Sequence, residues 1–236
     1  MNYFETAWES SVEIFKSIIE NFKHEPLFMW SILITSIVGL AIAAERLIYV
    51  QSASSLDKEA FMNRIYSQIL KGNIQGAIQV CMQMENPLTE IVKEGLIAVA
   101  NNKSAEEVQT AMDSVALREI PKLEKRTSLL ALMSNLATLI GLLGTIAGLI
   151  GAFKAVAGVS PDQKAAMLSS SISLAMNCTA FGLFVAIPLL AIFGYIQTRA
   201  TETVDDIHEV AVRTLNFILS NRNKINPQGT TPKKGS

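Results

Sequence analysis

Residues 127–153 read TSLLALMSNLATLIGLLGTIAGLIGAF, a run of 27 residues without one charged side chain. An α-helix rises about 1.5 Å per residue, and about 20 helical residues cross a hydrocarbon core of about 30 Å. The run is therefore long enough to form a membrane-spanning helix. Two further uncharged runs, 27–44 and 165–198, predict two more spans. The helix of the first span is expected to continue past its uncharged run to residue 50. The predicted spans are 27–50, 127–153 and 165–198.

The composition agrees with a membrane protein and excludes several other classes. Half of the 236 residues are apolar and 17% are charged, and the mean hydropathy is +0.32. Lys and Arg together number 20 against 21 Asp and Glu, so there is no basic excess for binding nucleic-acid phosphates. Cys81, Cys178, His24 and His208 follow no metal-ligand spacing, and no nucleotide-binding or nucleophile motif is present. We therefore expect neither an enzyme nor a resident metal or cofactor.

Lysine and arginine predict how the chain is oriented in the membrane. Sixteen of the 20 lie in 46–126 or from 199 onward, which a three-span topology places on the same side. Basic loops stay in the cytoplasm. The N-terminus is therefore expected outside, the C-terminus inside, and 154–164 as a short periplasmic loop. Because the first 25 residues carry five glutamates, we expect no secretory signal peptide.

The segments outside the predicted spans are helical in pattern. Residues 1–25 carry an aromatic stripe at helical spacing, which favours an amphipathic helix on the outer membrane surface over a helix docked on a partner. The segment 51–126 predicts a helical cytoplasmic region. The segment 199–225 predicts a continuation of the third span into the same bundle, and 226–236 predicts a disordered tail.

A capping box marks one helix start in the cytoplasmic region. Ser104 is followed three residues later by Glu107, and these side chains can each satisfy a free backbone amide of the other. We expect a helix to begin there, bend at Pro121 and continue without interruption into the second span.

Small and weakly polar residues form one stripe on each of the last two spans. The stripe of the second span comprises Ser134, Thr138, Gly141, Thr145, Gly148 and Ala152, and that of the third comprises Ser171, Ala175, Thr179, Gly182 and Ala186. Tight helix packing explains any single position. Two stripes, each with a central threonine, favour helices that line a narrow shared cavity. Gly144, Asn177 and Pro188 are assigned instead to helix packing, interhelical hydrogen bonding and a bend.

Four stretches of the sequence resemble one known family. They are AERLIY (44–49), PKLEKR (121–126), IGLLGTIAG (140–148) and TAFGLFVAIP (179–188). Together they resemble the ExbB/TolQ branch of the MotA/TolQ/ExbB proton-channel family, and the resemblance covers roughly residues 39–200. It implies an all-α membrane protein in which three transmembrane helices extend into a cytoplasmic helical bundle and several copies assemble as a ring.

The resemblance also implies partners and site residues. A pentameric ring would surround the single membrane helices of a dimeric ExbD/TolR-like partner, whose aspartate carries the ion. Thr145 and Thr179 match the two pore threonines. The other stripe residues apart from Ala152 are expected to line the pore or contact the partner helix: Ser134, Thr138, Gly141, Gly148, Ser171, Ala175, Gly182 and Ala186. Where transport members of the family commonly carry a glutamate, five residues before the second threonine, this chain has Leu174.

The expected function follows from that resemblance. It is a stator subunit in the bacterial inner membrane that couples inward ion flow, with H⁺ favoured over Na⁺, to work on the cell envelope. The work would be transport energisation, envelope maintenance or gliding-type motility, with a TonB/TolA-like or other effector as a further partner. The alternative is a non-conducting membrane scaffold for a single-span partner. A transporter acting alone is disfavoured because the spans carry no internal repeat and no charge.

Overall fold

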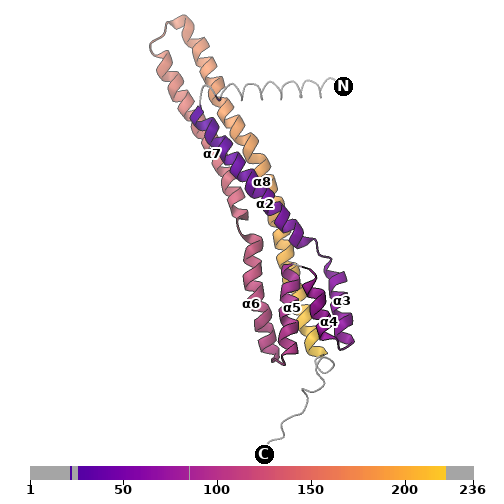
Figure 1. The fold of residues 1–236 in the computed structure, drawn as a ribbon. Coiled ribbons are helices and arrows are strands. Elements are labelled where there is room, and N and C mark those ends of the chain that lie inside the picture. Colours follow the sequence, from indigo (N-terminus) through magenta and orange to yellow (C-terminus); the bar gives the residue numbers. More distant parts are fainter. Residues whose placement is uncertain (1–21, 23–25, 85, 222–236) are drawn as a thin grey trace, which may run out of the picture. The chain divides into compact units, whose positions relative to one another are not determined.

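The computed structural model describes residue 22 and residues 26–84 and 86–221. Every regular element in these ranges is an α-helix, which confirms the predicted all-α class (Figure 1). The helices are α2 (Pro26–Ser54), α3 (Lys58–Leu70), α4 (Ile74–Met82), α5 (Pro87–Ala100), α6 (Ala105–Glu124), α7 (Thr127–Val156) and α8 (Pro161–Ser220). The amphipathic helix predicted within 1–25 and the tail predicted for 226–236 fall outside the described residues, except for Phe22.

The chain divides into two compact units. The spanning unit comprises the chain up to Glu45 together with Arg126–Tyr195, and the bundle unit comprises Arg46–Lys125 together with the chain from Ile196. Three helical stretches are long and apolar enough to cross a membrane, namely Leu27–Ser54, Ala105–Val156 and Pro161–Ser220. The protein is therefore a multi-pass membrane protein whose spans are provided by α2, α7 and α8.

The helix predicted to run unbroken into the second span is in fact interrupted. Helix α6 accommodates Pro121 in its last turn and ends at Glu124, where the Lys125 N–H donates to Pro121 O at 2.9 Å. Lys125 then adopts an extended conformation, and Arg126 has a left-handed φ of 63°. A left-handed residue cannot continue a right-handed helix, so α7 starts afresh at Thr127. The expectation of one continuous helix bent at Pro121 was wrong.

The predicted capping box is present at the start of α6. Ser104 Oγ accepts a hydrogen bond from the Glu107 N–H at 3.2 Å, and the Glu107 carboxylate accepts one from the Ser104 N–H at 2.7 Å. The hydrogen bond from the Ser104 backbone lowers the pKa of the Glu107 carboxyl below its usual value. This confirms the start of α6 as the sequence predicts it.

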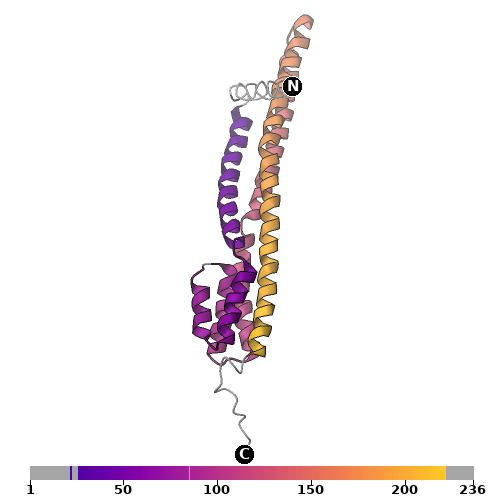
Figure 2. The same cartoon turned by 90° about the vertical axis from the view of Figure 1, so that its right-hand side faces the viewer.

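The helices of the bundle unit pack around an apolar core. Helices α3 to α6 each contact the next in the chain, and they lie beside the C-terminal part of α8 (Figure 2). Phe61, Met62 and Ile65 of α3 are fully buried among residues of α5, α6 and α8. Three ion pairs join α3 to α8 at the polar edge of this core. Lys58 pairs with Asp206 at 2.6 Å and with Glu209 at 2.8 Å, and Arg213 pairs with Glu59 at 2.7 Å.

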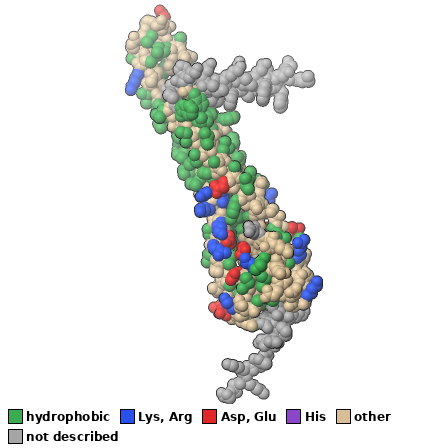
Figure 3. All heavy atoms as spheres, in the orientation of Figure 1, with side chains coloured by type: hydrophobic (Ala, Val, Ile, Leu, Met, Phe, Trp, Pro, Cys, Tyr) green, Lys and Arg blue, Asp and Glu red, His purple; other side chains and the backbone are tan. Residues whose placement is uncertain are grey.

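The spanning unit has a smaller core and an apolar exterior. Met29 and Ile32 of α2 pack with Ala137 of α7 and with Cys178 and Leu189 of α8, and all five are buried. Large apolar side chains cover the outside of the same three helices, where Figure 3 shows hydrophobic side chains gathered. Such an exterior suits lipid or another membrane helix rather than water.

Candidate functional site

The two threonines singled out by the sequence lie opposite each other between α7 and α8. The Thr145 and Thr179 hydroxyls are in hydrogen-bonding contact. The Thr179 hydroxyl also donates to Gly141 O at 3.1 Å. Thr145 Oγ1 lies 3.2 Å from the same carbonyl oxygen and 3.3 Å from Ala175 O. Both threonines are half-buried, so this cluster of four oxygen atoms lies at the edge of the helix contact.

Glycines make this close approach of the two helices possible. A Cβ on Gly182 would lie 2.7 Å from Ala137 O, and a Cβ on Gly141 would lie 2.9 Å from Cys178 O. Both distances are shorter than a real Cβ contact, and both involve backbone atoms that cannot rotate away. Small residues at a membrane helix contact let the two backbones approach. The threonine hydroxyls reach across the contact for that reason.

The oxygen cluster can accept and donate hydrogen bonds but cannot change its charge. Threonine hydroxyls do not titrate near neutral pH, and carbonyl oxygens only accept hydrogen bonds. No charged residue occurs between 127 and 153 or between 165 and 198. Among the described residues, no group of His, Cys, Asp or Glu side chains could hold a metal ion. The arrangement can therefore stabilise a carboxyl group, a water molecule or a passing cation that comes from elsewhere.

The structure brings the two predicted stripes together as the packing surface between α7 and α8. Ser134 Oγ donates to Ala186 O at 2.8 Å, which ties the N-terminal end of the α7 stripe to the C-terminal end of the α8 stripe. Five stripe members from both helices are buried in this contact and present almost no surface outward: Ser134, Gly141, Ala175, Gly182 and Ala186. Ala152 is buried as well, at the far end of α7.

Other stripe members keep some exposed surface. Thr138, Gly148 and Ser171 are half-buried, like the two central threonines. Thr138 also donates to Ser134 O at 3.2 Å, one turn earlier. The lining of a pore or the contact with a partner helix, which the sequence predicts for both stripes, stays a prediction. Among the stripe residues it fits this half-buried set best.

The residues assigned to packing lie in three different settings. Gly144 is buried, and a Cβ there would lie 3.0 Å from Cys178 Cβ and 3.3 Å from Phe28 Cβ, so this glycine lets α7 contact both α8 and α2. Asn177 is half-buried on α8, and Pro188 is exposed within the same helix.

Sequence reasoning missed a buried arginine in the bundle unit. Arg46 is only 4% exposed, and its guanidinium donates to Lys122 O and Leu123 O at the C-terminal end of α6. It also lies over the Tyr49 ring, at 4.9 Å from the ring centroid. A positive charge suits the carbonyl end of a helix. The sequence signal was the Glu45-Arg46 pair at the end of an uncharged run, which is also typical of a membrane-interface anchor.

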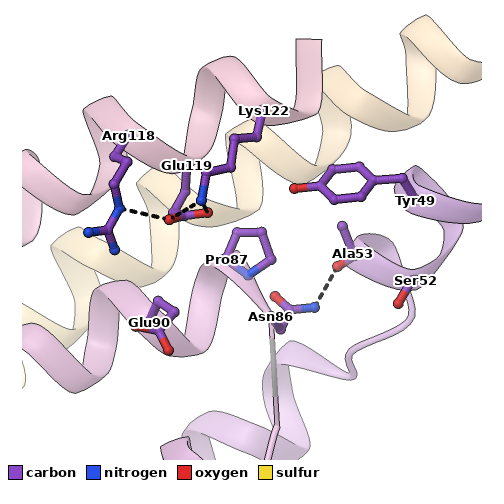
Figure 4. A pocket seen from close by; sticks show the side chains of 9 residues that line it. All are labelled: Tyr49, Ser52, Ala53, Asn86, Pro87, Glu90, Arg118, Glu119 and Lys122. Atoms are coloured by element: carbon purple, nitrogen blue, oxygen red, sulfur yellow. Dashed lines mark hydrogen bonds and ion pairs between the residues drawn. The ribbon is translucent and has the colours of Figure 1, made fainter. Parts of the chain in front are cut away.

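A pocket of about 350 Å³ opens in the bundle unit (Figure 4). Glu119, at 7% exposure, is the buried charge in it, and both Arg118 and Lys122 donate to its carboxylate, at 3.0 and 2.8 Å. Asn86 on the opposite wall donates to Ala53 O at 2.8 Å. Because these polar groups already bind one another, the pocket offers little to a charged ligand.

Comparison with known proteins settles the family. A sequence model described as the MotA/TolQ/ExbB proton channel family matches residues 83–209, which contain both threonines and the whole contact between α7 and α8. The chain belongs to the MotA/TolQ/ExbB proton channel family. Its ExbB character is supported by a relative from Methanothermobacter thermautotrophicus, whose name calls it a biopolymer transport protein ExbB homolog. The two are 27% identical over 203 residues, which cover 86% of this chain and 71% of the relative.

Proposed function

We propose that this chain is the ring-forming channel subunit of a motor driven by an ion-motive force, and that it works with an ExbD/TolR-like single-span partner. Membership of the proton channel family supports a channel or stator role. The single observation that carries the proposal is the Thr145 and Thr179 hydroxyl pair in the uncharged contact between α7 and α8. The expected assembly is five copies around two partner helices, in the bacterial inner membrane with the N-terminus outside.

The proposed mechanism assigns the charge change to the partner and the stabilisation to this chain. An aspartate in a membrane helix is costly to ionise unless polar groups lie near it. The hydroxyls of Thr145 and Thr179 supply such groups, while Leu174 adds no second carboxyl to the site. A partner aspartate would therefore lose and regain its ion as it enters and leaves the environment of one threonine pair.

Repetition of the site turns ion transfer into motion. The two partner helices cannot occupy equivalent positions in a ring of five sites at the same time. Each ion transfer therefore favours a small rotation of the partner toward the next site. One charge moving through 100 mV releases about 2.3 kcal/mol. Several transfers can therefore drive a load on the cell envelope, such as energised transport, envelope maintenance or gliding-type motility, through a TonB/TolA-like or other effector. We favour H⁺ over Na⁺ as the ion.

Removing the hydroxyls tests this function. Ion flux through proteoliposomes that hold this chain and its single-span partner is expected to fall about tenfold in Thr145→Ala or Thr179→Ala, since a hydrogen bond to a charged group contributes about 1.5 kcal/mol or more. Serine at either position should retain flux. Thr35→Ala is the matched control, because the Thr35 hydroxyl donates to Ser31 O one turn earlier in α2, at 2.8 Å, and not across the contact between α7 and α8.

The same variants separate the motor from the alternative, a scaffold that does not conduct. A scaffold needs the helix contacts but not the hydroxyls, so it would tolerate both alanine variants and fail only when Gly144 or Gly148 becomes bulky. Full flux and full output in Thr145→Ala and Thr179→Ala would overturn the motor proposal.

A further inference from the structure

A polar side chain lies on the outer face of α7 where lipid or a second protein must cover it. Asn135 is exposed, and so are Leu132 and Leu139, one turn away on each side. Asn135 follows Arg126 by nine residues, about 13 Å along a helix, so it lies inside a hydrocarbon core of about 30 Å. Within the described part of the chain, no hydrogen bond from its amide is found. A short side chain at this depth cannot reach the membrane surface, so facing lipid would cost free energy.

An acceptor of the matching kind lies on the outer face of α8. Pro188 has no N–H, so it leaves the carbonyl of Phe184, one turn earlier, without its helical donor. Pro188 is exposed, and Phe184 is 61% exposed. Among the residues that the structure describes, no side chain donates to this carbonyl. The stretch of α8 that carries this acceptor therefore faces the outside of the spanning unit, together with Leu183, Ile187 and Leu190.

The donor and the acceptor lie at the same level of the membrane. The hydrogen bond from Ser134 Oγ to Ala186 O places residues 134 and 186 side by side. Asn135 is one residue from the first, and Phe184 is two residues from the second, a difference of about 3 Å or less along the helix axes. Asn135 of α7 and Phe184 of α8 are both exposed, and no hydrogen bond is found between them within one copy.

We propose that the outer face of α7 in one copy contacts the outer face of α8 in the next copy, and that the Asn135 amide donates to the Phe184 carbonyl across this contact. Rotation about an axis normal to the membrane leaves depth unchanged, so neighbouring copies keep the two groups level. A donor on one surface and its acceptor on another make a head-to-tail contact, which gives a ring when the rotation between copies closes. The inference rests on the assembly of copies under the proposed function and adds the surfaces and groups that join them.

Disulfide crosslinking in membranes tests which faces meet. In a chain with Cys81 and Cys178 replaced by alanine, Asn135→Cys combined with Phe184→Cys should give a ladder of covalent multimers on oxidation, and neither single variant should exceed a dimer. The matched control pairs Phe184→Cys with Ile37→Cys. Ile37 is 60% exposed on α2, and the contact of Gly39 with Leu189 sets it near the same depth. The control should give no ladder.

A double-mutant cycle tests the hydrogen bond itself. Asn135→Leu should weaken association of copies about threefold to tenfold, as measured by dissociation on detergent dilution, because interhelical hydrogen bonds in membranes are modest. In a Pro188→Ala background, where the Phe184 carbonyl regains a helical donor, the same change should cost less than twofold. If Asn135→Leu weakens association equally in wild type and in Pro188→Ala, the proposed hydrogen bond is overturned.

Native mass of the cysteine variants separates this inference from the proposed function. A multi-copy assembly without the ladder, or with an equal ladder in the control, overturns the contact between these faces and leaves the motor proposal standing. A single copy by native mass overturns both.

Discussion

Gly182 shows how a single residue decides the distance between two membrane helices. Replacing it with alanine places a Cβ 2.7 Å from the Ala137 carbonyl oxygen, a backbone atom held in α7. We expect Gly182→Ala to lower the free energy of unfolding in detergent by about 1–3 kcal/mol, the usual cost of overpacking. Unfolding by a denaturing detergent, followed by circular dichroism, measures the change.

Gly151 provides the matched control for that prediction. It lies in α7 with nothing within 4 Å of where a Cβ would be. Gly151→Ala should therefore be neutral or stabilising by up to about 1 kcal/mol, because alanine favours a helix more than glycine does. If both variants lose the same free energy of unfolding, the close approach of α7 and α8 at Gly182 does not account for the stability.

The sequence predicted which residues form the candidate site, but it did not predict which atoms they contact. Helical spacing placed Thr145 and Thr179 on small-residue stripes, and the structure has the two hydroxyls touching. The same stripes suggested a lining, whereas Ala175 and Gly182 are buried in the contact between α7 and α8. Spacing along one helix says which residues share a face, but the partner of that face depends on the relative register of two helices.

Glu119 carries the clearest pH dependence among the helices of the bundle unit. Burial raises the pKa of its carboxyl, but hydrogen bonds from Lys122 and Arg118 outweigh burial and hold that pKa below the usual 4.5. The stabilisation is complete above about pH 4.5 and is lost as the pH falls through the lower folded pKa. Glu119→Gln should cost about 1 kcal/mol at pH 7, since solvent screens the half-exposed cations.

Comparing the unfolding free energy at pH 7 and pH 3 checks this assignment. The difference between wild type and Glu119→Gln should shrink at pH 3, where the wild-type carboxyl begins to protonate. Glu124→Gln on the same helix is the control, because that carboxylate is exposed. A difference that stays constant with pH would show that Glu119 acts through packing instead of charge.

Local sequence signals predict most of the helices and the start of α6, but they do not predict where α6 ends. The Ser104 and Glu107 pair predicted where α6 begins, because a capping box acts within one turn. The end of α6 was misplaced because the sequence offers Pro121 as the obvious disruption, while the actual break is a left-handed Arg126. That arginine bonds to Glu45 of α2 at 2.8 Å, a contact between residues far apart in the chain that no local rule predicts.

For the whole molecule, the distribution of Lys and Arg predicts which segments face each side of the membrane. A membrane-impermeant maleimide should label Gly158→Cys in intact cells, but Ser104→Cys only after the membrane is made permeable. The native cysteines give little background, since Cys81 and Cys178 are buried and burial raises the pKa of the Cys81 thiol to about 12. Labelling of both variants in intact cells would contradict the predicted orientation.

The number of copies and the partner lie beyond what one chain can reveal, because a ring is made of contacts between chains. The proposed motor requires this chain to form a ring around a carboxylate-bearing partner. The most direct test is the native mass of the complex purified in mild detergent after co-expression with a single-span ExbD/TolR-like protein. We predict five copies of this 236-residue chain with two copies of the partner. A single copy, or a ring that never retains the partner, would contradict the proposed motor and favour a scaffold.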